Sequence, residues 1–194
     1  ASEMSDKTGG LVVAHVADIR AAGAVEKLID EIWQNSGPLT GLVNNAAGQI
    51  MSPTEKLSVR GFDAVAATVF NGTYYVTHSV GKRWIQEGLQ GNIISILVTW
   101  IWSGSPYVVP SVMSKAGINA MTKSLAVEWA KFNIRLNAIA PGPFPTEGAW
   151  TRLHPEVETR GVEEDLARVP MGRYGKMSEL KNLAVFLMSD GCEY

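Results

Sequence analysis

The sequence has almost no cysteine, no surplus of charge of one sign and no hydrophobic run long enough to cross a membrane. Cys192 is the single cysteine among 194 residues, so no internal disulfide can form, which fits a reducing compartment such as the cytoplasm. A formal net charge of −2 predicts no electrostatic attraction to nucleic acid. The longest apolar run, 93–102, is interrupted by Ser95 and Thr99 and is about half as long as a membrane helix, which needs ~20 residues.

The apolar material that is present suits one globular domain. At 46% hydrophobic over 194 residues, the chain can build a sizeable core, and we expect a single domain over 1–194. It opens with Ala1 and a short polar stretch typical of a helix, and we expect the N-terminus to be incomplete. The three histidines share no spacing typical of metal ligands, so no metal site is predicted at His15, His78 or His154.

Apolar runs and helical periodicities alternate along the chain. Four runs predict buried strands: 11–17, 42–46, 93–98 and a fourth from Ile134 to the turn at Pro141. Helical spacing predicts helices over 25–34, 59–86, 111–131 and 180–188. Asn71-Gly72 should kink the second of these helices, since both residues are poor helix formers. Continuously apolar strands need helices on both faces, which predicts an α/β fold with a doubly wound, Rossmann-like parallel sheet.

Ligands of such sheets bind where the carboxyl ends of the strands meet. Asp18, Asn45, Val98 and Pro141 all lie at or just beyond the carboxyl ends of predicted strands, so we expect them at this edge. The polar, proline-broken segment 144–175 predicts either a lid over the edge or a poorly ordered loop.

The helix predicted over 111–131 is apolar around most of its circumference. Such a helix is buried on several sides. One face fits the sheet, and the other fits a second subunit or, alternatively, the chain's own irregular segment.

Four motifs occur in an order and spacing that resemble the short-chain dehydrogenase/reductase family. Asn44-Asn45-Ala46-Ala47-Gly48 resembles its Asn-Asn-Ala-Gly signature with one extra alanine, and Asn71 resembles its helix asparagine. Ser111 to Lys115 stand where the family has Tyr-x-x-x-Lys. Pro141-Gly142, followed by Thr146, resembles the loop that clasps the nicotinamide. The resemblance covers nearly the whole chain.

Within that family the chain looks most like the 2,4-dienoyl-CoA reductases. The segments that carry this likeness are Ala46 to Gln49, Ser52 to Glu55, Gly104 to Ser111 and Pro141 to Thr146. The resemblance implies an unsaturated acyl-CoA substrate, NADP or NAD as cofactor with NADP favoured, and a homotetramer.

The resemblance also implies three sets of site residues. The catalytic set is Lys115, Trp100, Gln49, Ser111 and Asn71. The cofactor set is Asp18, Ile19, Asn45, Ala46, Gly48, Lys115, Pro141, Gly142, Pro143, Phe144 and Thr146. The substrate set is Arg20, Ile50, Ser58 and Arg152.

Physical chemistry gives reasons for several of these assignments. Lys115 lies four residues after Ser111, so both side chains project from one helix face. A lysine there can bind ribose hydroxyls and favour a developing oxyanion, and its apolar surroundings argue against a surface role. Arg20 can pair with a phosphate through its planar fork. By residue type alone, Asp18 is equally well a turn residue or a helix cap.

Two departures from the family pattern bear on the chemistry. Ser111 replaces the general family's acid/base tyrosine, and the dienoyl-CoA reductases' earlier tyrosine and asparagine are Trp100 and Gln49 here. Both side chains donate hydrogen bonds, and neither is a useful acid. They form a hypothetical donor pair for a thioester oxygen, with water protonating carbon; alternatively, Trp100 is only a pocket wall. Tyr107 could replace the acid, but its position is normally phenylalanine.

No Gly-x-x-x-Gly-x-Gly phosphate loop follows any predicted strand. We therefore expect the chain to lack the family's first strand-loop-helix unit, and its final strand as well. Three functions remain open: an NAD(P)H-dependent reductase of an unsaturated acyl-CoA, a short-chain alcohol dehydrogenase or ketoreductase, and a catalytically silent structural or regulatory subunit.

Overall fold

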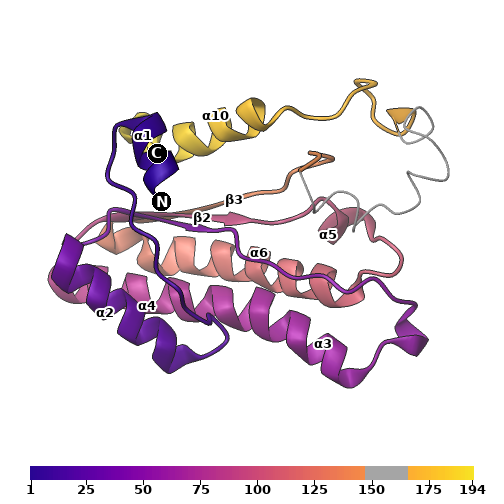
Figure 1. Ribbon diagram of the computed structural model, residues 1–194, viewed down its shortest axis with the longest axis horizontal. Coiled ribbons are helices and arrows are strands. Elements are labelled where there is room, and N and C mark those ends of the chain that lie inside the picture. The colour runs from indigo at the N-terminus through magenta and orange to yellow at the C-terminus, as the bar shows by residue number, and fades with distance from the viewer. Residues whose placement is uncertain (147–165) are drawn as a thin grey trace.

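A parallel sheet of three strands forms the centre of the computed structural model, which describes residues 1–146 and 166–194 (Figure 1). The strands are β1 (Gly41–Asn44), β2 (Gly91–Ile96) and β3 (Ile134–Ile139), in the spatial order β1-β2-β3. The helices are α1 (Ser2–Thr8), α2 (Ala22–Ser36), α3 (Val59–Ala66), α4 (Gly72–Glu87), α5 (Trp100–Ser103), α6 (Val109–Trp129) and α10 (Met177–Met188). Short helical turns are η1 (Thr54–Lys56), the π-helical η2 (Ala67–Asn71), η3 (Ala130–Phe132) and η4 (Asp190–Cys192).

Helices cover both faces of the sheet. Helices α4 and α6 pack against one face, α2 packs on α4, and α10 lies on the opposite face against β2 (Figure 1). Both strand pairs are parallel, so each strand must be joined to the next by a crossover connection. Helices form these connections. The predicted doubly wound α/β architecture is confirmed.

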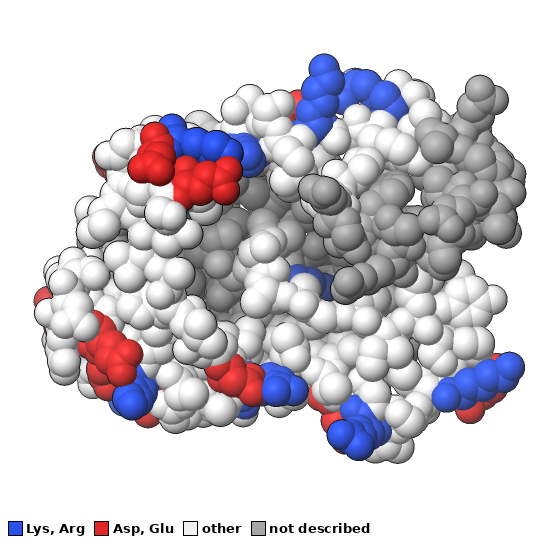
Figure 2. Space-filling view, in the orientation of Figure 1, with Lys and Arg blue, Asp and Glu red and all other residues white. Residues whose placement is uncertain are grey.

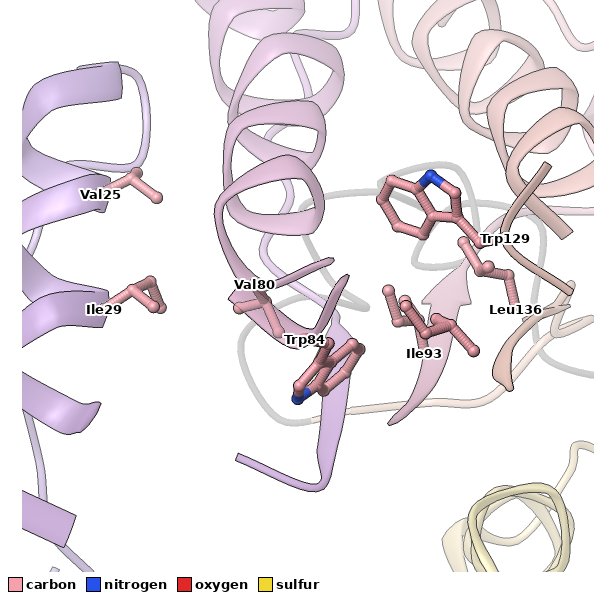
Figure 3. Packing of buried hydrophobic residues seen from close by; sticks show 8 residues of the cluster. Val25, Ile29, Val80, Trp84, Ile93, Trp129 and Leu136 are labelled. Atoms are coloured by element: carbon pink, nitrogen blue, oxygen red, sulfur yellow. The ribbon is translucent and has the colours of Figure 1, made fainter. Parts of the chain in front are cut away.

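The main hydrophobic core lies between the sheet and the α2–α4 pair. Val25 and Ile29 of α2 point toward Val80 and Trp84 of α4, as Figure 3 shows. Trp84 is fully buried, and its indole N–H donates to the carbonyl of Leu39 at 2.6 Å. A buried indole needs such an acceptor, because its N–H loses water on folding.

The predicted strand over 11–17 is wrong. In the structure this segment pairs with no strand of the described residues, and Leu11 and Val16 are almost fully exposed. Valine-rich sequence favours a strand only where a neighbouring strand satisfies the backbone N–H and C=O groups. Here the N–H of Val12 donates instead to the Ser5 hydroxyl at 2.9 Å. Beyond the segment, Ile19 packs against Gly72 at the start of α4, which anchors the chain again.

A π-helical turn lies where a kink was predicted at Asn71-Gly72, and the backbone stays helical through it. The π-helical turn η2 ends at Asn71, and α4 begins at the next residue. Hydroxyl groups on either side of this turn bond back into the helix: Thr68 donates to the Ala64 carbonyl and Thr73 to the Val69 carbonyl. Widened turns of this kind are frequent at functional sites, because they free or redirect backbone carbonyls.

Charges of both signs lie close together on the surface. Figure 2 shows lysine and arginine beside aspartate and glutamate along the rims of one face. Among the described residues the ion pairs include Lys7–Glu3, Arg20–Asp18, Lys27–Glu31, Arg83–Asp30 and Arg173–Glu179. Within 1–146 and 166–194, no helix is long and apolar enough for a bilayer, and no cluster of three potential metal ligands occurs.

Candidate active site

The carboxyl ends of the three strands meet at one edge of the sheet. Asn45 follows β1, Leu97 to Trp100 follow β2, and Ala140 to Pro143 follow β3. The N–H of Leu97 donates to the Ile139 carbonyl at 2.7 Å, so β2 and β3 stay paired up to this edge. The structure therefore places Asn45, Val98 and Pro141 at the predicted ligand-binding edge.

Lys115 is buried inside the protein, as its apolar helix predicts. Its exposed fraction is 6%, and its amine donates to the main-chain carbonyl of Ile96, the last residue of β2. Burial lowers the pKa of the Lys115 amine from 10.5 to about 8, because the charged form loses its hydration. Ser111 lies one helical turn earlier and is half-buried.

Gln49 holds a hydrogen-bond donor that is buried and unused. Its side-chain nitrogen is shielded from solvent and has no hydrogen-bond partner. A buried amide without an acceptor costs about 1–3 kcal/mol, so such groups are rare unless a ligand completes them. Gln49 comes from the loop after β1, at the same edge of the sheet.

Trp100 begins the short helix α5, four residues after the end of β2. The carbonyl of Trp100 accepts a hydrogen bond from the N–H of Gly104 at 2.9 Å, and the side chain is half-buried. Trp100 and Lys115 thus flank the end of β2 from two different helices. The Gln49 loop is joined to the loop after α5 by a hydrogen bond from the Ser52 N–H to the Tyr107 carbonyl at 3.0 Å.

The predicted cofactor residues that follow β1 and β3 form a partly exposed rim at this edge. Asn45, Ala46, Gly142 and Thr146 are exposed, as is Asn71 at the π-helical turn. The half-buried residues of the predicted cofactor set are Ile19, Gly48, Pro141, Pro143 and Phe144. A rim of exposed polar groups around a buried amine can hold a polar ligand whose reactive end lies inside.

The two ends of the predicted lid, 144–175, lie together. The N–H of Gly175 donates to the Pro143 carbonyl at 3.0 Å, and the Phe144 ring occupies the space where a β-carbon on Gly175 would lie. Glycine at position 175 is therefore required by the aromatic ring. Residues 147–165 of the segment, with the predicted substrate residue Arg152, lie outside the described residues.

Two of the predicted substrate residues lie together at the start of α3. The Ser58 hydroxyl accepts a hydrogen bond from the Gly61 N–H at 3.1 Å and caps this helix. A β-carbon on Gly61 would be 3.4 Å from the Ile50 side chain and 3.2 Å from the Ser58 hydroxyl. Ser58 thus has a structural role that its position before a helix could have indicated.

Asp18 and Arg20 form a two-point ion pair with each other. The Arg20 guanidinium donates to both carboxylate oxygens of Asp18, at 2.7–3.1 Å, and the Arg20 N–H donates to one of them. These bonds lower the pKa of the Asp18 carboxyl to about 2. Both side chains are about half exposed. The Asp18 carboxylate accepts the N–H two residues on, so Asp18 acts as a turn residue, one of the two roles that its residue type allows.

A buried polar network beneath the site was missed by sequence reasoning. The Asn44 amide donates to the Thr77 hydroxyl at 2.9 Å and to the Ser95 hydroxyl at 3.5 Å, and all three residues are buried. The network joins β1, β2 and α4. The Asn-Asn dipeptide after an apolar run was the available signal, since a buried amide must find partners.

Tyr107 adopts a backbone conformation that its residue type does not predict. Its φ is 66°, in the left-handed region, where only Asn133 joins it among the non-glycine residues that the structure describes. No sequence signal marks this position, because a bulky side chain disfavours that region.

Comparisons with known proteins agree with this architecture. The family model described as enoyl-(acyl carrier protein) reductase matches residues 1–194. A protein of Caenorhabditis elegans named probable 2,4-dienoyl-CoA reductase 3 is 42% identical over 192 residues, which are 98% of this chain and 62% of that protein. The chain spans about three fifths of the length of the Caenorhabditis elegans relatives that it matches.

Solved structures resemble the chain over nearly its whole length. A short-chain dehydrogenase of Bacillus anthracis is 41% identical, with a TM-score of 0.77 over 91% of this chain and 68% of that one. A gluconate 5-dehydrogenase of Burkholderia cenocepacia, solved with NADP and tartrate, is 28% identical, with a TM-score of 0.89 over 100% of this chain and 74% of that one.

Proposed function

Because the chain belongs to the short-chain dehydrogenase/reductase family, we propose that it forms part of an NAD(P)H-dependent reductase of an unsaturated acyl-CoA, similar to a 2,4-dienoyl-CoA reductase. The observation that carries the proposal is the buried Lys115 amine at the Ile96 carbonyl, with Ser111 one turn before it. The charged amine of Lys115 lies at the ligand edge, and position 111 has a serine where the general family has its acid/base tyrosine. This arrangement suits stabilisation of an oxyanion better than proton donation.

The residues at the edge fit the nicotinamide end of a dinucleotide. An ammonium group has three donors, and the Ile96 carbonyl takes one, so the others can reach ribose hydroxyls. The exposed amide of Asn45 and the hydroxyl of Thr146 supply further polar groups at the rim. When bound, the cofactor supplies a hydride. NADP is favoured over NAD by resemblance to relatives, including the NADP complex of the Burkholderia cenocepacia dehydrogenase.

Gln49 and Trp100 would bind the thioester oxygen of the substrate. The unpartnered amide nitrogen of Gln49 and the indole N–H of Trp100 are both donors without acidity at neutral pH. They can lower the energy of negative charge that develops on this oxygen as the conjugated system is reduced. The proton for carbon then comes from water, because neither donor can release one.

The second candidate is a ketone or alcohol oxidoreductase, which the likeness to the Burkholderia cenocepacia dehydrogenase favours. Reduction of a ketone requires an acid to protonate the oxygen, and Ser111 is a far weaker acid than a tyrosine. A catalytically silent subunit of the same fold is the third candidate. The buried Lys115 opposes it, since an unused buried amine only destabilises the protein.

One substrate panel separates the three candidates. Full-length protein is mixed with NADPH or NADH and a 2,4-dienoyl-CoA, a simple enoyl-CoA or a simple ketone, and cofactor oxidation is followed by absorbance. We expect oxidation with the dienoyl-CoA. Oxidation with ketones alone would favour the second candidate. Cofactor binding, measured by calorimetry, without oxidation of any substrate would favour the third.

We further expect the protein to assemble with copies of itself. Helix α6 exposes Met113 and Val127, the latter at 82%, on the face turned away from the sheet. Exposed large apolar side chains on a helix favour burial against another subunit. The family resemblance makes a tetramer the expected form, and light scattering of the full-length protein would measure its mass. The single cysteine favours a reducing compartment such as the cytoplasm.

A further inference from the structure

The loop between α5 and α6 contains a tyrosine in a conformation that tyrosine disfavours. Tyr107 has a φ of 66°, and its side chain is 51% exposed, so packing of the ring does not account for the conformation. In the left-handed region the β-carbon crowds the following carbonyl oxygen. Such a residue persists only where its surroundings hold it, and conformations of this kind cluster at active sites.

Contacts on both sides of Tyr107 show what holds it. After it, Val108 is buried, and the Val108 carbonyl accepts the first hydrogen bond of α6, from Val112. The carbonyl of Tyr107 itself accepts the N–H of Ser52 at 3.0 Å. Within the part of the chain that the structure describes, this is the only backbone hydrogen bond between the loop after β1 and the loop after α5.

The loop that Ser52 belongs to carries Gln49, three residues earlier. The Gln49 amide nitrogen is buried without a partner, so no hydrogen bond from this nitrogen holds it in place and the backbone of the loop has to position it. Tyr107 follows α5, which begins at Trp100. The hydrogen bond from the Ser52 N–H to the Tyr107 carbonyl therefore connects two loops. One loop carries the proposed donor Gln49, and the other follows the helix that begins at the proposed donor Trp100.

We propose that Tyr107 is a positioning residue whose left-handed backbone, not its phenol, fixes the Gln49 loop relative to α5 for binding of the substrate carbonyl. This inference rests on the proposed function for the identity of the substrate. The loop geometry itself does not depend on it. A normal backbone conformation at position 107 would turn the carbonyl away from Ser52 and release the Gln49 loop. A misplacement of about 1 Å in a binding group can lower a rate about 100-fold.

Substitutions at Tyr107 separate the backbone from the side chain. Tyr107→Asn removes the phenol but tolerates the left-handed region, whereas Tyr107→Val is β-branched and resists it. We expect Tyr107→Asn to keep the kcat/KM of the wild-type protein for a 2,4-dienoyl-CoA, and Tyr107→Val to lower it by about 10- to 100-fold. Equal losses in both variants would overturn the proposal, because the phenol would then be the functional group.

Asn133 provides the matched control. It is also left-handed, with a φ of 57°, but it precedes β3 at the opposite edge of the sheet. Asn133→Val should lower the melting temperature as Tyr107→Val does while leaving kcat/KM unchanged. If Asn133→Val lowers kcat/KM as much as Tyr107→Val, the effect is one of general stability, and the proposal is wrong.

A second measurement needs no substrate. The side-chain amide signals of Gln49, observed by NMR in the full-length protein, should shift in Tyr107→Val but not in Tyr107→Asn. Ser52→Pro removes the hydrogen-bond donor from the other loop and should produce the same shift, even if Tyr107→Val does not fold. Unmoved Gln49 signals would overturn the inference. If the wild-type protein is inactive on acyl-CoA but the variants show these shifts, only the proposed function is overturned.

Discussion

The Lys115 amine donates a hydrogen bond to the main-chain carbonyl of Ile96, and this bond joins the middle of α6 to the end of β2. No carboxylate supplies a counter-charge among the contacts that the structure describes for Lys115. The Lys115 ammonium group is therefore buried away from water, and among its described contacts only the dipole of the Ile96 carbonyl replaces the lost hydration.

Stability should therefore depend on pH through Lys115. The Lys115 amine has a pKa of about 8 in the folded protein and 10.5 as a free side chain, so between these values the unfolded chain binds a proton that the folded protein does not. The free energy of unfolding should rise with pH across this window, by about 3 kcal/mol at most. Lys115→Met should abolish the rise and stabilise the protein by about 2 kcal/mol at pH 7. Urea unfolding at pH 7 and pH 10 measures both, and parallel pH curves for the two proteins would refute the prediction.

Replacing Gln49 should separate stability from activity. Gln49→Met keeps the length of the side chain and removes the buried, unpartnered amide, so the free energy of unfolding should rise by about 1 kcal/mol. If the amide binds the thioester oxygen, kcat/KM for the dienoyl-CoA should fall by about 100-fold. Denaturant titration and steady-state kinetics test the two halves separately. A destabilised Gln49→Met protein with full activity would mean that the amide has only a structural role.

Two substitutions distinguish a donor from a pocket wall at position 100. Trp100→Phe retains an aromatic surface but has no N–H, whereas Trp100→Ala loses both. A donor role predicts that Trp100→Phe loses about 100-fold in kcat, nearly as much as Trp100→Ala. A wall role predicts that Trp100→Phe remains close to wild type. The comparison is made at saturating cofactor and substrate and repeated in single-turnover experiments, which separate the chemical step from product release.

Two glycines should respond in opposite ways to the same change. A β-carbon on Gly81 would overlap the Trp129 ring where α4 meets α6, so Gly81→Ala should destabilise the protein by about 1–3 kcal/mol. Gly23 lies in the first turn of α2 with no atom near its missing β-carbon, and Gly23→Ala should stabilise the protein by about 0.5 kcal/mol. Thermal unfolding of both variants gives the sign of each change. Destabilisation by Gly23→Ala, or none by Gly81→Ala, would contradict the packing described for these helices.

Local patterns in the sequence were sufficient for most of the fold. The helical spacing around Val25 and Ile29 predicted α2, and Asn71-Gly72 marked the place where the π-helical turn η2 passes into α4. The apolar surroundings of Lys115 predicted its burial. These features depend on residues within a few turns of one another, where backbone preference and side-chain periodicity act directly.

The remaining features were decided by partners far apart in the chain. The segment 11–17 has the composition of a strand and is exposed, because a strand also needs a neighbour to pair with. The unused amide of Gln49 and the left-handed backbone of Tyr107 depend on how two loops meet, about 55 residues apart in sequence. By itself the sequence determined the long helices, the apolar segments and which motifs follow each strand of the sheet. Tertiary structure alone decided which hydrogen-bonding groups found partners, since that depends on atoms brought together only by folding.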